Sequence, residues 1–163
     1  MKRYVISGKR CVVVKKHDGC INVTIQEDYC DFKIVTMPSK RWAHFVSIIN
    51  RVEESLGQID LEQDVELCEH IGGGWYVSVC TGFKCVDFRK FNNYHSFELK
   101  PTKNGIALRI PEWYILKAIV SNIQTDFPEL ASETLCIHTH DKLNICSECN
   151  AFMYELLSRL PNI

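Results

Sequence analysis

The side chains best suited to chemistry lie near the C-terminus of the sequence. Cys136, His138, His140, Cys146 and Cys149 place five thiol and imidazole groups within fourteen residues. A Cys-x-x-Cys turn together with a Cys-x-His or Cys-x-x-x-His arm has the spacing with which zinc collects four tetrahedral ligands. The spacing therefore predicts a structural Zn²⁺ site, in which either His138 or His140 is the spare group.

Two other interpretations of these cysteines stay open at this point, a surface thiol cluster and a redox pair. A redox Cys-x-x-Cys normally lies in a βαβ unit, and the sequence around residues 146–149 has no such pattern. A catalytic zinc needs an open coordination position and a nearby acid or base. Glu148 could be that group, but the His-x-Glu and second Cys-x-x-Cys of cytidine deaminases are missing.

Other catalytic motifs are also missing from the sequence. It has no Gly-x-Ser-x-Gly elbow and no phosphate-binding loop, and its glycine run at residues 72–74 precedes a predicted strand instead of a helix. We therefore expect a protein that is not an enzyme.

A second group of functional side chains lies between residues 75 and 103, where aromatic and basic residues alternate. Aromatic rings can stack on unpaired bases, at about 1–3 kcal/mol per base, while basic groups follow the phosphates. The alternative is that the aromatics form sheet core and the lysines only cover the surface; alternation places Phe88 in the core. The predicted nucleic-acid-binding residues here are Trp75, Phe83, Lys84, Arg89, Phe91, Lys100 and Lys103.

Taken alone, the net charge of −1 disfavours a nucleic-acid partner, since phosphate neutralisation drives much of such binding. The charges are segregated, however. Residues 1–56 carry ten Lys and Arg against six Asp and Glu, and residues 71–111 carry six against two. The acidic excess lies in residues 57–70 and 112–163. Two basic segments thus favour a nucleic-acid partner, although charge runs can also merely solvate a surface.

The composition indicates a folded protein with no membrane partner. Hydrophobic residues make up 46% of the chain, yet no apolar run reaches the roughly 18 residues that span a bilayer. Nine cysteines without a signal peptide indicate free thiols or metal ligands. We expect a reducing compartment, the nucleus or the cytoplasm, and no secretion.

The elements that would position these groups follow an internal repeat. Residues 6–14 align without a gap with residues 71–79, and both segments continue through a turn into an alternating strand pattern. Val23 and Ile25 of the first copy correspond to Val86 and Phe88 of the second. Each copy then reaches a proline and a tryptophan-bearing helical pattern, so each predicts strands followed by a helix.

Both predicted helices carry an apolar face that should be buried. The first has Ser39 as its expected cap and Gly57 just past its end; the second starts at Pro111 and stops near Pro128. A unit of roughly 60 residues is marginal alone, so the two copies should pack together. The expected core positions are Trp42, Phe45, Ile49, Val52 and Leu56 in the first helix and Leu116, Ile119, Val120 and Ile123 in the second.

Five motifs of the second copy resemble the DNA-binding domain of the transcriptional coactivator called positive cofactor four. They are IG at 71–72, WYVSV at 75–79, VDFRKF at 86–91, LKPTKNGIAL at 99–108 and PEW at 111–113. The first copy fits the same pattern less closely. Together the resemblance covers residues 5–56 and 70–124.

The resemblance implies a four-stranded antiparallel sheet followed by a helix, working as a homodimer that holds single-stranded or melted DNA on its curved sheets. In this chain the two halves of such a dimer would be fused. The first copy departs from the family, because His17, Gln26 and Tyr29 replace an aromatic, an arginine and a tryptophan, and it lacks the Lys-Pro-x-x-Lys-x-Gly loop. We expect unequal halves. The binding residues predicted in the first copy are Lys9, Arg10, Lys15, Lys16, His17 and Tyr29.

The sequence therefore predicts an α+β protein of two tandem sheet-plus-helix units, paired as an intramolecular pseudo-dimer. The units span 1–56 and 70–127, with an acidic linker at 57–69. A zinc-binding segment and a short amphipathic helix at 151–160 follow within 128–163. The expected function is single-stranded DNA binding, with RNA as a possible ligand, alongside transcription or replication proteins, and further self-association stays open. The alternative is a protein–protein adaptor that uses the acidic linker and zinc tail to recruit a partner.

Overall fold

The computed structural model describes residues 1–92, 98–139 and 146–150, and within them eight strands form two four-stranded antiparallel sheets. The first sheet has the order β1-β2-β3-β4 and the second the order β5-β6-β7-β8. The strands are β1 (Lys2–Ser7), β2 (Arg10–His17), β3 (Cys20–Glu27), β4 (Ile34–Pro38), β5 (Glu66–Gly72), β6 (Trp75–Cys80), β7 (Cys85–Asn92) and β8 (Lys100–Arg109).

A helix follows each sheet, α1 (Ser39–Asp60) after β4 and α2 (Ile110–Asp126) after β8. Two short helices come next, α3 (Pro128–Ala131) and the 3₁₀ helix η1 (Cys136–His138). The order of four strands and a helix thus occurs twice. This arrangement confirms the predicted α+β class and the two tandem units.

Alternation along the strands separates a buried face from an open face in each sheet. Val14 of β2 pairs with Val23 of β3, and Val77 of β6 pairs with Phe88 of β7; all four side chains are fully buried. The repeat positions 23, 25, 86 and 88 therefore face the core, as the alternating pattern predicts. The predicted core positions of both helices are buried as well.

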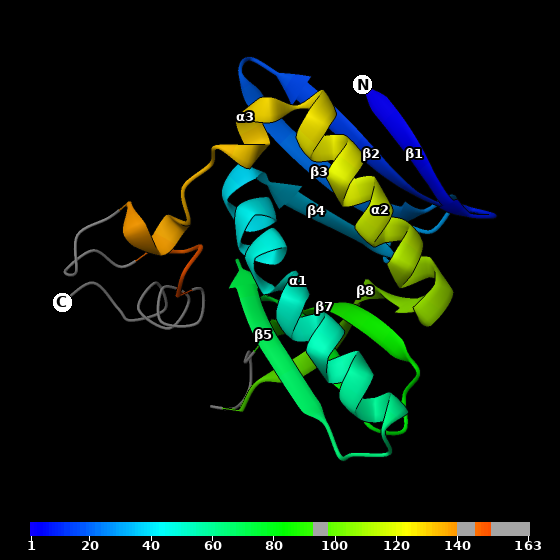
Figure 1. Ribbon diagram of the computed structural model, residues 1–163. Helices are drawn as coiled ribbons and strands as arrows, with labels where there is room; N and C mark the ends of the chain where they lie inside the picture. The colour runs from blue at the N-terminus through cyan, green and yellow to red at the C-terminus, as the bar shows by residue number, and fades with distance from the viewer. Residues whose placement is uncertain (93–97, 140–145, 151–163) are drawn as a thin grey trace, which may run out of the picture.

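The two units share one hydrophobic core, because each helix contacts the sheet of the other unit. The Phe45 ring of α1 lies 5.3 Å from Phe88 of β7 and 6.2 Å from Trp113 of α2, measured between ring centroids. Trp113 Nε1 also donates a 2.7 Å hydrogen bond to Glu53 of α1. Both helices cover the same side of the two sheets, with α1 running along β5 (Figure 1). The chain therefore forms the intramolecular pseudo-dimer that the repeat predicts.

The sheets meet where β8 approaches β4 and the turn before it. The Gly105 amide of β8 donates a 2.9 Å hydrogen bond to the Phe32 carbonyl oxygen. Gly105 has φ +152°, and a Cβ there would lie 2.1 Å from the Phe88 carbonyl oxygen. Only glycine therefore fits this crossing, which brings a loop of the first unit beside the second sheet.

Three local predictions are wrong. Residues 57–69 are not a linker, because α1 continues to Asp60 and β5 begins at Glu66, which leaves 61–65 as the connection. Gly57 lies within α1 and not just past its end. Ile59 still packs against the core, and this contact outweighs the cost of about 1 kcal/mol for a glycine within a helix. Ser39 makes no capping hydrogen bond, since Pro38 occupies the cap position.

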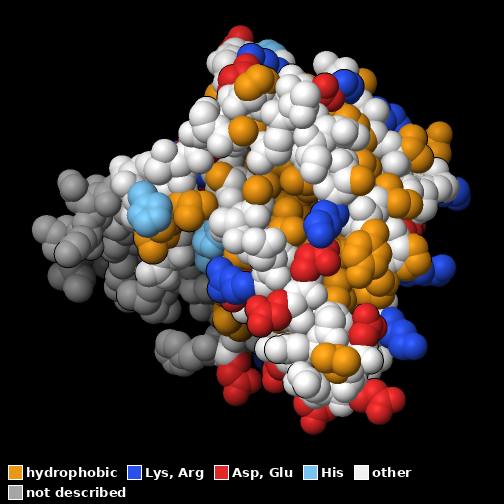
Figure 2. Space-filling view, viewed as in Figure 1, with side chains coloured by type: hydrophobic (Ala, Val, Ile, Leu, Met, Phe, Trp, Pro, Cys, Tyr) orange, Lys and Arg blue, Asp and Glu red, His pale blue; other side chains and the backbone are white. Residues whose placement is uncertain are grey.

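The acidic side chains of this region gather at one end of the molecule. Asp60, Glu62, Asp64 and Glu66 are all exposed around the connection from α1 to β5, where acidic groups cluster in Figure 2. Among the described residues, no helix is long and apolar enough to cross a membrane.

Replacing Phe45 with alanine should destabilise both sheets together, because its ring joins the two halves of the core. We expect the free energy of unfolding to fall by about 3–5 kcal/mol. Urea denaturation followed by circular dichroism measures the loss, and hydrogen exchange of β2 and β7 tests cooperativity. Ser47→Ala, at an exposed position of the same helix, is the control. Protection lost from one sheet alone would show that the units unfold separately.

Candidate nucleic-acid interface and metal centre

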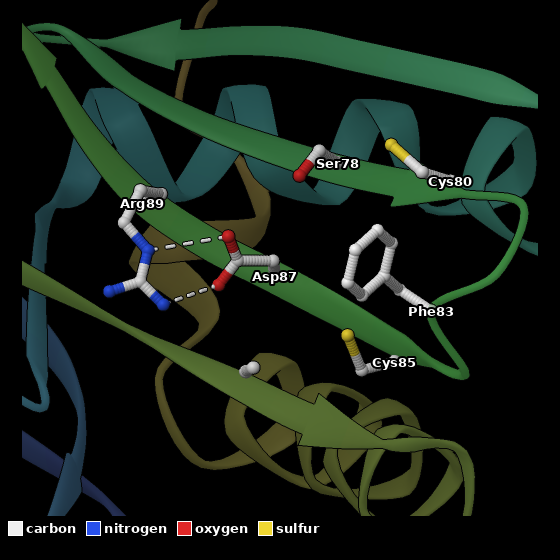
Figure 3. A pocket seen from close by; sticks show the side chains of 7 residues that line it. Ser78, Cys80, Phe83, Cys85, Asp87 and Arg89 are labelled. Carbon is white, nitrogen blue, oxygen red and sulfur yellow. Dashed lines mark hydrogen bonds and ion pairs between the residues drawn. The ribbon is translucent and has the colours of Figure 1, made fainter. Parts of the chain in front are cut away.

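The second sheet has a hollow on the face that points away from the helices. Since Val77, Val79, Val86 and Phe88 face the core, the alternate side chains of β6 and β7 point to the open side. They enclose, with two neighbours, a cavity of about 310 Å³ (Figure 3). Its lining residues are Ser78, Cys80, Phe83, Cys85, Asp87, Arg89 and Ala107.

Arg89 is held in a fixed position beside this hollow. Its Nε and Nη2 atoms donate to the two carboxylate oxygens of Asp87 at 3.3 and 2.8 Å, and Nη1 donates to the Lys103 carbonyl oxygen at 3.0 Å. The Phe83 ring is 69% exposed and lies between the thiols of Cys80 and Cys85 (Figure 3). Burial raises the pKa of both thiols, which therefore stay neutral.

A row of aromatic rings continues along the same open face. The ring centroids of His70 and Tyr76 are 5.0 Å apart, and those of Tyr76 and Phe91 are 4.9 Å apart. Phe91 was predicted from the sequence, whereas His70 and Tyr76 were not. Alternation along β6 could have identified Tyr76, which lies between the core-facing residues Trp75 and Val77, but the place of His70 beside it depends on the pairing of β5 with β6.

The predicted lysines of the second unit lie around this face. Lys84, Lys100 and Lys103 are all exposed. Lys103 Nζ lies 5.7 Å from the ring centroid of Phe32, a residue of the first unit that is 42% exposed. The sequence analysis also missed Phe32, since its place beside Lys103 depends on the crossing of the two units.

Trp75 does not lie on the open face, contrary to the sequence prediction. It shares the core-facing side of β6 with Val77 and packs, partly buried, against the core. The alternation of β6 decides this, because adjacent residues of a strand point to opposite faces. Trp75 is therefore a packing residue, and Phe83 is the exposed aromatic of this sheet's hollow.

Two basic residues predicted to bind nucleic acid in the first unit are held by acidic partners. Arg10 forms ion pairs with Glu27 at 3.0 Å and Glu112 at 2.8 Å, and Lys16 pairs with Glu129. Hydrogen bonds from Lys33 and Arg10 lower the pKa of Glu27. Arg10 and Lys16 thus attach α2 and α3 to the first sheet.

The remaining predicted residues of the first unit are exposed. Tyr29 is fully exposed and has φ +63°, and Lys9 and Lys15 are solvent-facing. His17 is 88% exposed beside Asp18. The first unit thus presents exposed basic groups at Lys9 and Lys15.

Three of the predicted metal ligands lie together. The sulfur atoms of Cys136, Cys146 and Cys149 all lie within 4.8 Å of one another, close enough to hold a metal ion. The Cys149 amide donates to Cys146 Sγ at 3.5 Å and lowers the pKa of that thiol, whereas burial raises the pKa of Cys149 to about 12. His138 is exposed and outside this group, while His140 and the predicted helix at 151–160 lie outside the described residues.

The cysteine turn is attached to the body of the protein through Glu148. Its carboxylate oxygens accept hydrogen bonds from Arg41 Nε at 2.6 Å and Nη2 at 2.9 Å, and its carbonyl oxygen accepts one from the Gly73 amide at 2.8 Å. A Cβ at Gly73 would lie 2.3 Å from Arg41 Nη2. The glycine run is therefore the docking point of the cysteine turn.

Comparisons with known protein families, curated proteins and solved structures found no significant match to this chain.

Replacing Arg10 with alanine should reduce stability more than it reduces nucleic-acid affinity. Because Glu112 would lose its guanidinium partner, we expect a loss of about 1–3 kcal/mol in urea unfolding. Lys9→Ala removes the same charge from an exposed neighbour and should leave stability unchanged. A stable Arg10→Ala protein with weakened binding would show that Arg10 contacts the ligand instead.

Replacing Gly73 with alanine should release the cysteine turn from α1. The matched control is Gly19→Ala, because Gly73 and Gly19 both have positive φ, +61° and +78°, but only Gly73 has side chains within 4 Å. Both variants incur backbone strain of about 1 kcal/mol, and Gly73→Ala should incur a further loss through the clash. Thermal unfolding measures both. Equal losses would mean that the Arg41 and Glu148 contacts contribute nothing.

Proposed function

We propose that this protein binds single-stranded nucleic acid on the open face of its second sheet. The observation that carries the proposal is the hollow that has exposed Phe83 at one end and the fixed guanidinium of Arg89 at the other, with Asp87 between them (Figure 3). The described elements leave this face uncovered, whereas the helices cover the other face.

The chemistry of the face favours unpaired bases. Phe83 offers a ring for stacking, and Arg89, whose charge is balanced by Asp87, offers a planar guanidinium. The row of His70, Tyr76 and Phe91 extends the stacking surface. In a duplex the base faces are already stacked on one another, so a single strand should bind better.

The charges around the face suggest a path for the phosphates. Lys100 and Lys103 lie on β8, while the exposed acids near Glu66 lie at the opposite end of the sheet, where β5 begins beside Cys80. Phosphates are attracted to the first region and repelled from the second. The Phe83 end of the hollow lies beside Cys80 and therefore at the acidic end, so it is offered to an uncharged base, while the phosphates follow Lys100 and Lys103 toward Phe32. The first unit contributes less.

A transcription or replication cofactor is the role that suits such binding, in keeping with the sequence resemblance to positive cofactor four. Because both units belong to one chain, a single molecule supplies both halves of the pseudo-dimer and does not need to dimerise in order to bind.

The three-cysteine group is a structural zinc site in this proposal. Thiolates with one imidazole are a ligand set that zinc favours. Cys136, Cys146 and Cys149 supply three ligands. Because His138 lies outside the group, His140 is the fourth ligand that the sequence offers.

Fluorescence anisotropy with a labelled strand of about 20 nucleotides, competed by duplex and by RNA, tests the binding face. Lys100→Ala/Lys103→Ala should weaken binding and reduce the slope of log Kd against log salt by about 1.4. Phe83→Ala should cost about 1–3 kcal/mol without changing that slope. These two signatures separate phosphate contacts from stacking.

The matched control for charge is Lys2→Ala/Lys117→Ala, which removes the same charge near α2, away from the open face. It should leave affinity unchanged. Absence of binding by the unaltered protein at low salt would overturn the proposed function and favour the protein–protein adaptor.

Metal titration with Co²⁺, whose visible spectrum reports tetrahedral thiolate ligation, tests the zinc site. We expect one ion per chain, displaced by Zn²⁺, and loss of the signal in Cys149→Ser. His140→Ala should weaken binding at least tenfold while His138→Ala should not, because each missing ligand lowers affinity. The reverse result would assign the fourth ligand to His138.

A further inference from the structure

The Glu148 contacts link the cysteine group to the open face of the second sheet. Glu148 lies between Cys146 and Cys149 in the turn, and its carboxylate receives two hydrogen bonds from Arg41 of α1. The side chain of Arg41 is 13% exposed and that of Glu148 is 26% exposed, so this pair is largely shielded from water. Shielding strengthens a charged pair with two parallel hydrogen bonds.

The same turn fixes the backbone at the start of β6. The Glu148 carbonyl oxygen accepts the Gly73 amide at 2.8 Å, and Lys90 Nζ donates to the Gly73 carbonyl oxygen. A Cβ at Gly72 would lie 2.2 Å from Glu148 Oε1, so a side chain there would displace the carboxylate. The glycine run at residues 72–74 is therefore held from two sides, by the cysteine turn and by Lys90 of β7.

The glycine run also contacts the row of aromatic rings formed by His70, Tyr76 and Phe91. The Gly74 amide donates to His70 Nε2 at 3.1 Å, and the Gly74 carbonyl oxygen accepts the Phe91 amide at 2.9 Å. His70 and Phe91 are the two ends of the row that has Tyr76 at its centre. A continuous path of contacts thus runs from the cysteines to the rings.

We infer that Glu148 is a positioning residue that couples metal binding by the three cysteines to the His70–Tyr76–Phe91 row. This inference rests on the proposed function, because the row belongs to the proposed nucleic-acid face. A metal ion fixes the geometry of a cysteine turn. A turn fixed in this way holds its carboxylate against Arg41 and its carbonyl oxygen against Gly73 at the same time.

Hydrogen exchange of residues 66–80, with Zn²⁺ and with a chelator, tests the coupling directly. In the unaltered protein, Zn²⁺ should slow exchange at Gly73 and Gly74 by about tenfold. Glu148→Gln should abolish this difference, since the charge is lost and one of the two oxygens that accept from Arg41 becomes an NH₂ group that opposes the guanidinium N–H. Ser147→Ala changes an exposed residue of the same turn and should keep the difference.

Co²⁺ titration of Glu148→Gln is the accompanying measurement, and the metal should still bind with about the affinity of the unaltered protein. A lost exchange difference with a loaded metal site is the result that supports coupling, because a purely structural role would not depend on the metal. An undiminished exchange difference in both Glu148→Gln and Glu148→Ala would overturn the inference, as would a lack of any difference in the unaltered protein.

Strand affinity in the two metal states separates this inference from the proposed function. Zn²⁺ should tighten binding of the 20-nucleotide strand about fivefold to tenfold in the unaltered protein and have no effect in Glu148→Gln. If no strand binds in either state, the proposed function fails, and the exchange result still decides the coupling. If strands bind equally with and without Zn²⁺, the proposed function stands and the coupling is refuted.

Discussion

The structure depends on the burial of α1 and α2 against the two sheets at once. A unit of roughly 60 residues buries only a marginal amount of apolar surface alone. Phe45 illustrates the solution, since its ring contacts Phe88 of the second sheet and Trp113 of the second helix. Arg10 adds polar contacts across the same boundary through Glu112 and the Ala107 carbonyl oxygen. The two copies therefore form one folding unit.

Both helices occupy one side of the two sheets, and the described elements leave the open face of the second sheet uncovered. The two units differ in what their charged and aromatic side chains contact. In the second sheet the open face holds a hollow with Phe83 and Arg89, whereas in the first unit Arg10 and Lys16 stabilise packing. The two units also meet where Phe32 of the first lies beside Lys103 of the second.

The cysteine turn lies outside the two repeated units and contacts them through Glu148. Arg41 of the first unit and Gly73 of the second both bind Glu148, so the turn joins the units a second time. The glycine run, which has no phosphate-loop context, is explained by this contact. It allows two backbone segments to approach more closely than a side chain would permit.

The sequence by itself determined the features that depend on local pattern. Alternation identified the buried positions Val23 and Phe88, helical periodicity identified the buried faces of α1 and α2, and cysteine spacing identified the group formed by Cys136, Cys146 and Cys149. The family resemblance and the nucleic-acid ligand stay predictions.

Only the tertiary structure decided which partner each polar or glycine residue meets. Arg10 pairs with Glu112 across 102 positions of sequence, and Arg41 pairs with Glu148 across 107, so no local pattern could reveal either contact. The extension of α1 through Gly57 has the same origin, because Ile59 packs against a core that includes the second unit. Periodicity reports which side of an element is buried, but the identity of what covers it depends on how distant segments pack.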